Sequence, residues 1–206
     1  MKDQFKDKAK DWDEAPWKRS MTQEAYSAIT SRISIPPEAR LLDLGGGTGL
    51  FALKFIHDVA TITVVDTSEG MLDMLRQKIR EQKLEKVEII NGDLATGIVS
   101  ENSCELIISM MTMHHIEDVS SLFECFYEIL VPGGSIAIVD LAKEDGDFHH
   151  REAVYVHNGF EKEDLQKPLE DKGFENIRFY ELTKVSKESS KGVLKDYPIW
   201  LVIASK

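Results

Sequence analysis

The sequence predicts an α/β fold in which helices cover both faces of a mostly parallel β-sheet. Two observations support this prediction. Along most of the chain, continuously apolar runs alternate with amphipathic segments of helical period, which is typical of strands that are buried on both faces and joined by helices. The 206 residues are 42% hydrophobic and 30% charged, as expected for one globular domain with a sizeable core.

The elements follow one another without repeats or linkers. Apolar residues between Trp12 and Ile29 recur at roughly helical spacing until Pro36-Pro37, so this first part is expected to be helical. Short apolar runs then predict five strands, at residues 40–44, 61–65, 87–90, 104–108 and 135–140. Further helices are expected to begin at Leu50 and after the capping residue Ser68, and to cover residues 119–130 and 162–172.

The last two apolar runs differ from the others. Residues 176–184 and 199–204 follow the expected helix at 162–172, with no helical pattern between them. Two successive strands joined in this way predict an antiparallel hairpin at the edge of the sheet.

The net charge argues against a nucleic-acid partner. The chain has 36 acidic and 25 basic side chains and a formal charge of −11 at pH 7, which repels phosphate backbones. The densest basic stretch, residues 76–86, alternates with Glu81 and Glu85 and has the pattern of a solvent-facing helix surface. We therefore expect no nucleic acid as substrate.

The sequence also predicts a soluble protein of the cytoplasm. Cys104 and Cys125 lie in apolar runs without C-x-x-C spacing, as reduced core residues do. The charged N-terminus contains no apolar signal region, and no apolar run reaches membrane-spanning length. No feature of the sequence indicates an oligomeric state.

A glycine loop, Asp43-Leu44-Gly45-Gly46-Gly47-Thr48-Gly49, follows the first expected strand. Glycines let the chain turn tightly and let a ligand lie against bare main chain. A dinucleotide fingerprint G-x-G-x-x-G would end three residues after Gly47, whereas Gly49 comes two residues after it. Asp43 would repel a pyrophosphate but attract an ammonium group. This favours S-adenosylmethionine, which carries an ammonium, a sulfonium and no phosphate, over NAD.

At this loop the chain resembles the class I S-adenosylmethionine-dependent methyltransferases, and the resemblance extends from Leu41 to the C-terminus. Residues 41–49 look like the first motif of that family, although Gly46 stands where the family more often has Cys or Ala. Residues 64–72 resemble the second motif and residues 91–94 the adenine-binding turn. Residues 130–135, followed by Asp140, resemble the turn and the fifth strand of the family.

The resemblance implies a fold and a domain organisation. It predicts a Rossmann-like, seven-stranded mixed sheet, mostly parallel with one antiparallel edge strand and with helices on both faces. One methyltransferase domain is then expected over residues 1–206, with a helical lid or cap at 1–37 and the Rossmann-like core at 38–206.

The resemblance also assigns S-adenosylmethionine to particular residues. Asp43 would anchor the methionyl ammonium, Asp66 at the end of the second strand would bind the ribose hydroxyls, and Asp93 would accept a hydrogen bond from the adenine amine. The full predicted set is Asp43, Leu44, Gly45, Gly46, Gly47, Gly49, Asp66, Thr67, Met71, Asp93, Leu94, Ser109 and Met110.

Four histidines are the candidates for catalysis. His114 and His115 follow the fourth strand, where related enzymes place residues facing the acceptor, and either would serve as a general base or an orienting group. His149 and His157 come later, in the runs 144–149 and 156–160. These runs, together with residues 9–14, resemble a subgroup of small methyltransferases known chiefly from sequence. Within the family, the chain resembles the small-molecule enzymes of the ubiquinone/menaquinone-biosynthesis type.

The loop that carries His149 is rich in carboxylates and also includes His150. Above a bound cofactor it would bind a polar acceptor, deprotonate it or, as the less favoured alternative, hold a divalent metal. A solvated acidic surface loop is the plainer interpretation. No H-x-x-x-H or H-E-x-x-H spacing supports a metal, so none is expected. Trp12 and Trp17 also have two interpretations. They would either form a lid over the sulfonium of the cofactor or pack in the core.

The predicted function is transfer of a methyl group from S-adenosylmethionine to a small-molecule acceptor. Two alternatives stay open at this point. A non-catalytic S-adenosylmethionine-binding protein would keep the cofactor motifs, because they are better specified than the catalytic residues. An NAD-dependent oxidoreductase is disfavoured by the glycine spacing.

Overall fold

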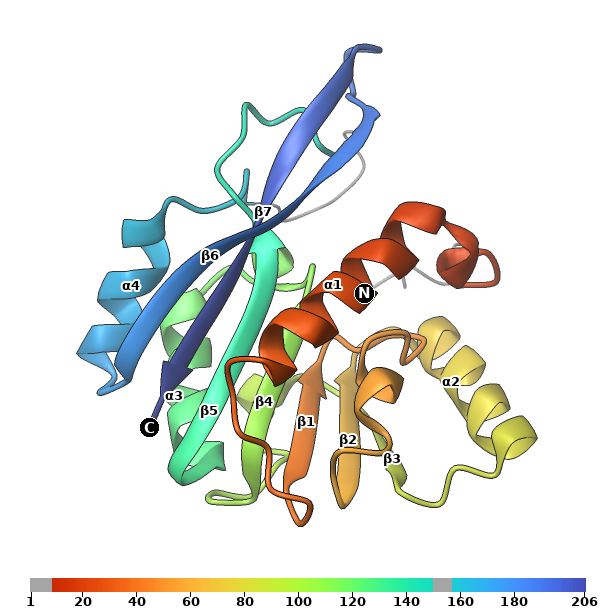
Figure 1. The fold of residues 1–206 in the computed structure, drawn as a ribbon, viewed down its shortest axis with the longest axis vertical. Helices are drawn as coiled ribbons and strands as arrows, with labels where there is room; N and C mark the ends of the chain where they lie inside the picture. Colours follow the sequence, from red (N-terminus) through yellow and green to blue (C-terminus); the bar gives the residue numbers. More distant parts are fainter. Residues whose placement is uncertain (1–8, 150–156) are drawn as a thin grey trace.

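Seven strands form one sheet in the order β3-β2-β1-β4-β5-β7-β6, in a computed structural model that describes residues 9–149 and 157–206 (Figure 1). All pairings up to β5 are parallel, and β7 is antiparallel to both of its neighbours. The predicted α/β fold with a mostly parallel, seven-stranded mixed sheet is confirmed. The strands are β1 (Arg40–Leu44), β2 (Thr61–Asp66), β3 (Val87–Asn91), β4 (Cys104–Met110), β5 (Leu130–Leu141), β6 (Glu175–Glu188) and β7 (Leu194–Ser205).

Residues 9–149 and 157–206 also contain four α-helices and four 3₁₀ turns, before and between the strands. They are η2 (Trp12–Glu14), α1 (Pro16–Thr30), η3 (Ala52–Phe55), α2 (Glu69–Gln82), η4 (Leu94–Thr96), η5 (Met113–His115), α3 (Val119–Ile129) and α4 (Lys162–Asp171). Their starts follow local sequence. Pro16 opens α1, the Ser68 side chain caps α2 as predicted, and the Asp118 carboxylate caps α3 by accepting from the N–H of Ser121.

Two expected helices are shorter than predicted. Helix α1 ends at Thr30 instead of continuing to Pro36, with Ser31 as its C-cap. The helix expected from Leu50 is only the 3₁₀ turn η3. There Phe51 and Phe55 both turn into the core with their rings 5.6 Å apart, and β2 begins at Thr61.

Helices cover both faces of the sheet, as predicted. Alternate residues of β1 serve two apolar layers: Leu41 belongs to the layer beneath α1, η3 and α2, whereas Leu42 belongs to the layer beneath α3 and α4. Because side chains alternate along a strand, Asp43 lies on the same face of the sheet as Leu41. Figure 1 shows α1 crossing one face of the sheet while α3 lies behind it. Among the described residues, no helix is long and apolar enough to cross a membrane.

The C-terminal hairpin is longer than its apolar runs. Strands β6 and β7 pair along nearly their whole length, from Glu175 with Ser205 to Glu188 with Leu194, and continue together past the end of β5 (Figure 1). The residues of β6 and β7 outside the apolar runs 176–184 and 199–204 are largely polar, so the apolar pattern underestimates the length of both strands. The single antiparallel strand of the sheet, β7, lies between β5 and β6.

Helix α4 offers a test of the second apolar layer. Leu169 is fully buried there, whereas Leu194 on the hairpin is 76% exposed. We expect Leu169→Ala to lower the free energy of unfolding by about 2–5 kcal/mol through the cavity that it leaves, and Leu194→Ala to change it by less than about 0.5 kcal/mol. Urea unfolding followed by circular dichroism measures both. Equal losses for the two variants would contradict this packing.

Candidate active site

The glycine loop between β1 and η3 lies against two other elements because it has no side chains there. Gly45, Gly47 and Gly49 all have positive φ, at 67°, 53° and 74°, a region that glycine enters without strain. A Cβ on Gly45 would lie 2.2 Å from Thr112 Oγ1, and one on Gly49 would lie 2.6 Å from Leu75 Cδ1. The loop therefore touches both the turn after β4 and helix α2.

Asp66, at the end of β2, is held at the rim of this loop. Its Oδ2 accepts from the Gly47 N–H at 2.8 Å, and its Oδ1 accepts from the Ser68 N–H at 2.7 Å. Met71 stands beside the same glycine, 3.8 Å from where a Cβ on Gly47 would lie, while Thr67 is exposed. Two backbone donors thus fix the carboxylate that was predicted to bind the ribose.

Asp43, at the end of β1, is a buried carboxylate with little compensation, since only the Ala52 backbone opposes the rise of its pKa. It is 1% exposed, and neither oxygen has a hydrogen-bond partner among the described residues. Burial, and then the charge of Asp66, raise its pKa well above the ordinary value. A buried unpaired carboxylate calls for a cation or a donor. This is the condition that the ammonium of S-adenosylmethionine would meet.

The residue that departs from the family pattern lies against this carboxylate. A Cβ on Gly46 would come within 2.6 Å of Asp43 Oδ2 and 2.7 Å of Val64 Cγ1. The Asp43 side chain therefore occupies the space that a larger residue at position 46 would need.

The remaining predicted cofactor residues have visible local tasks. Asp93 is exposed and caps η4 by accepting from the Ala95 N–H at 3.0 Å, while Leu94 is buried in the second apolar layer. Ser109 donates to the Leu44 carbonyl at 3.0 Å inside the sheet. Met110 is half-buried and lies against α1. Their contacts with a cofactor stay predictions.

A buried histidine–aspartate pair joins the ends of β4 and β5. His114 Nδ1 lies 2.5 Å from Asp140 Oδ1, and the two side chains are 1% and 2% exposed. Burial alone would raise the pKa of Asp140, but the charge and hydrogen bond of His114 and the Leu141 N–H outweigh it, so the pKa lies below its ordinary value. An ionised Asp140 favours a proton on His114 Nδ1, which orients the ring with its Nε2 directed away from Asp140.

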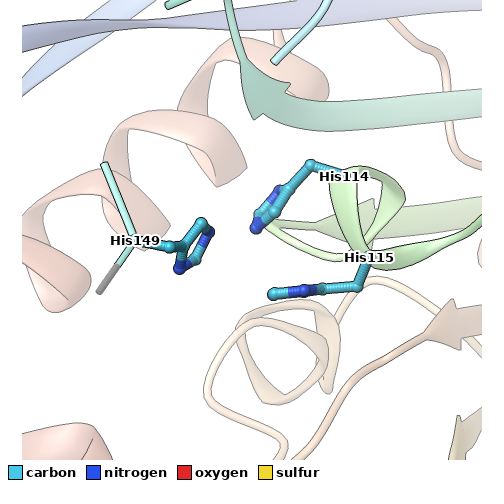
Figure 2. Close-up of side chains that lie close together, drawn as sticks. All are labelled: His114, His115 and His149. Carbon is cyan, nitrogen blue, oxygen red and sulfur yellow. The ribbon is translucent and has the colours of Figure 1, made fainter. Parts of the chain in front are cut away.

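Three of the four predicted histidines come together. His114 and His115 extend from η5, and His149 reaches the same space from the loop after β5 (Figure 2). Their ring centroids are 4.1, 4.9 and 5.1 Å apart. Burial, and then the charges of His114, His115 and Lys187, lower the pKa of His149 to about 3. No local spacing reveals this cluster, because its third member comes from a distant segment.

His157 is placed apart from the other three. Its ring Nε2 pairs with the Ile116 carbonyl at 2.8 Å, and its backbone N–H donates to the His114 carbonyl at 2.7 Å. His157 therefore stabilises η5 through hydrogen bonds to backbone carbonyls of this turn and of its C-cap residue, without entering the cluster of the other three rings. His150, also considered from sequence, lies outside the described residues.

Two carboxylates of the loop that carries His149, Glu144 and Asp147, turn toward the protein, whereas Asp145 is exposed. Glu144 Oε2 accepts from the N–H groups of Asp147 and Phe148, and the buried Asp147 accepts from the Tyr197 hydroxyl at 2.9 Å. This loop is thus anchored on β7, in contrast to a solvated acidic surface loop.

An N-terminal contact that sequence reasoning missed reaches the glycine loop. Asp13 in η2 accepts from the Thr48 hydroxyl at 2.6 Å and pairs with Lys78 of α2, whose Nζ also donates to the Thr48 carbonyl at 2.7 Å. Trp12 packs under Lys18, and Trp17 packs against the first apolar layer. The one feature of the sequence that hinted at this contact was the acidic residue Asp13 next to Trp12.

Comparisons with known proteins agree with this geometry. A family model described as a methyltransferase domain matches residues 41–134, from the glycine loop to the turn within β5. The ubiquinone/menaquinone biosynthesis C-methyltransferase UbiE of Klebsiella pneumoniae is 24% identical over 173 residues, which cover 69% of each chain. Together with the solved structures described below, these matches support a class I S-adenosylmethionine-dependent methyltransferase. Its cofactor is S-adenosylmethionine, which argues against the NAD-dependent oxidoreductase considered from sequence.

Two solved structures have the fold of this methyltransferase. One is a SAM-dependent methyltransferase from Aquifex aeolicus, with a TM-score of 0.71 and 19% identity, covering 97% of both chains. The other is phosphoethanolamine N-methyltransferase 2 of Haemonchus contortus in complex with S-adenosyl-L-methionine, with a TM-score of 0.73 and 20% identity. This chain is covered to 88%, but it spans only 52% of the Haemonchus chain.

We expect Asp66→Ala to weaken S-adenosylmethionine binding by tenfold or more, about 1.4 kcal/mol or above, because the ribose would lose a carboxylate fixed by two backbone donors. Isothermal titration of the cofactor into both proteins measures this. Asp73→Ala, on the exposed side of α2, is the matched control and should keep the wild-type affinity. An unchanged affinity in Asp66→Ala would disprove the ribose assignment.

Asp43→Asn tests the buried charge. Because folding raises the pKa of Asp43, the folded protein binds more protons than the unfolded chain between the ordinary carboxyl pKa and the raised value. The stability of the cofactor-free wild type should therefore fall as pH rises through this window. Asp43→Asn is expected to flatten that fall, which urea unfolding from about pH 4 to about pH 8 measures.

The same substitution should weaken cofactor binding by about tenfold or more, since the methionyl ammonium would lose its counter-charge. If Asp43→Asn kept the wild-type pH dependence of stability and the wild-type affinity, Asp43 would have neither a raised pKa nor a role in binding the cofactor.

Proposed function

We propose that this methyltransferase transfers a methyl group to a small-molecule acceptor bound beside His114, His115 and His149. The observation that carries the proposal is the convergence of these imidazoles on one space next to the glycine loop. Ligands of open parallel sheets bind beyond the carboxyl ends of the strands, and both features lie at that edge.

A single turn connects the two halves of the proposed site. Gly45 packs against the side chain of Thr112, whose backbone N–H donates to Asp140 Oδ2 at 3.1 Å. Thr112 directly precedes η5, which carries His114 and His115. An acceptor held by the histidines would thus lie next to the cofactor cradle, which is the placement that in-line transfer needs.

S-adenosylmethionine supplies a methyl group that its sulfonium already activates, so the chain mainly has to align the acceptor and exclude water. Asp43 would hold the ammonium, Asp66 the ribose, and Asp93 with Leu94 the adenine. At Gly47 the nearest atom lies 3.7 Å from where a Cβ would stand, so the main chain there would be open to the cofactor. Gly45, Gly46 and Gly49 would form the rest of the cradle through their close packing against the protein. We also propose that residues 1–37 act as a lid within a single domain, since Asp13 already ties this segment to Thr48 and Lys78.

The histidines supply the polar side of the acceptor site. With its proton held on Nδ1 by Asp140, His114 presents a buried Nε2 that would accept a hydrogen bond or a proton from the nucleophile. The low pKa of His149 keeps that ring neutral at physiological pH, and therefore also able to accept. His157 would act indirectly, by fixing η5.

The relatives and the charge support a small acceptor. The names of the Klebsiella and Haemonchus proteins refer to ubiquinone or menaquinone biosynthesis and to phosphoethanolamine. A formal charge of −11 opposes the approach of a nucleic acid.

The test is formation of S-adenosylhomocysteine with separate sets of small phenols and hydroquinones, small amines, mixed tRNA, and an unfolded protein. We expect turnover above the acceptor-free rate with at least one small compound and with neither macromolecule. His149→Ala should lower kcat/KM by about tenfold or more, whereas His57→Ala, on an exposed turn, should not change it. Methylation of tRNA or protein alone would refute a small-molecule acceptor.

A further inference from the structure

We propose that His114, His115 and His149 form a binding site for one divalent transition-metal ion, such as Zn²⁺. From sequence a metal was the less favoured alternative, because no metal-binding spacing connects these three histidines. The fold creates the site by bringing the loop after β5 over η5 (Figure 2).

The donor atoms are already close together. One ring nitrogen from each histidine can be chosen so that all three lie within 4.8 Å of one another. Zinc binds imidazole nitrogen at about 2.0–2.1 Å, which places tetrahedral donors about 3.4 Å apart. Small ring rotations would therefore close the cluster around an ion. His149 has freedom for this, since it extends from a loop and not from a strand.

Two of the donors lack any other use within the part of the chain that the structure describes. The Nε2 atoms of His114 and His149 are buried and have no hydrogen-bond partner there. A buried polar atom left in this state costs free energy. An ion between the rings would satisfy both atoms at once, which a hydrogen bond between two neutral acceptors would not do.

Asp140 completes the arrangement as a positioning residue. Its carboxylate holds the Nδ1 proton of His114 and is itself fixed by the N–H groups of Thr112 and Leu141. Metal-binding histidines commonly donate their second N–H to a carboxylate in this way, which sets the tautomer and directs the lone pair at the ion. His114 is thus oriented as a ligand.

The donor set indicates which ions would bind. Three neutral imidazoles suit Zn²⁺, Co²⁺, Ni²⁺, Cu²⁺ or Fe²⁺, whereas Mg²⁺ and Ca²⁺ prefer oxygen. Three protein ligands also leave a fourth position open.

That open position suggests an acceptor class, an inference that rests on the proposed function. A hydroxyl or thiol bound there would release its proton to water more readily. The resulting anion would form the new bond to the methyl carbon as the carbon–sulfur bond breaks, with that electron pair passing to sulfur. In the loaded protein His114 would then orient the acceptor through the ion, in place of accepting a proton itself.

Titration of Co²⁺ into the untagged, chelator-treated full-length chain tests the site without cofactor or acceptor. We expect one equivalent to produce the visible absorption of four- or five-coordinate Co²⁺, and Zn²⁺ to abolish it. His114→Ala, His115→Ala and His149→Ala should each weaken binding by tenfold or more. His57→Ala, which removes an exposed histidine outside the cluster, should bind as the wild type does.

A conservative variant separates positioning from folding. Asp140→Asn keeps all three ligands and should lower affinity by about 10- to 100-fold, with circular dichroism confirming that each variant is folded. The proposal is overturned if the wild type gives no such absorption, or if folded His149→Ala binds Co²⁺ unchanged. A protein that binds the ion but methylates no small acceptor would refute the proposed function alone.

Discussion

The catalytic edge depends on how closely the glycine loop approaches the turn after β4. Gly45 and Thr112 are in contact only because position 45 has no side chain, and Thr112 in turn donates to Asp140. One steric constraint therefore links the cofactor side of the site to the buried pair of Asp140 and His114. If the glycine loop moved outward, the proposed cofactor site would be separated from the histidines that are proposed to position the acceptor.

Three buried aspartates show how differently one fold can treat the same side chain. Asp140 and Asp147 are surrounded by donors, from His114 and from Tyr197 respectively. Asp43 has none among the described residues. The first two stabilise the architecture, whereas the third is a cost that the protein retains. This asymmetry identifies the end of β1 as the place where a positive ligand group belongs.

Much of this arrangement was predictable from the sequence because it depends on local pattern. Apolar runs predicted all seven strands, and strand ends located Asp43 and Asp66. The length of the β6–β7 hairpin was missed because its outer residues are polar and stabilised by pairing. The convergence of His149 with η5 could not be predicted either. It depends on a loop whose course is set by Glu144 and by contacts with Tyr197, which lie far away along the chain.

The close contact between position 46 and the Asp43 carboxylate has a consequence for the redesign of this loop. Substitutions toward a family consensus often stabilise a protein, yet the commoner Cys or Ala at position 46 would compete with Asp43 and Val64 for the same space. Either of these side chains would have to move to accept the larger residue. A consensus redesign of this loop therefore has to treat positions 43, 46 and 64 together.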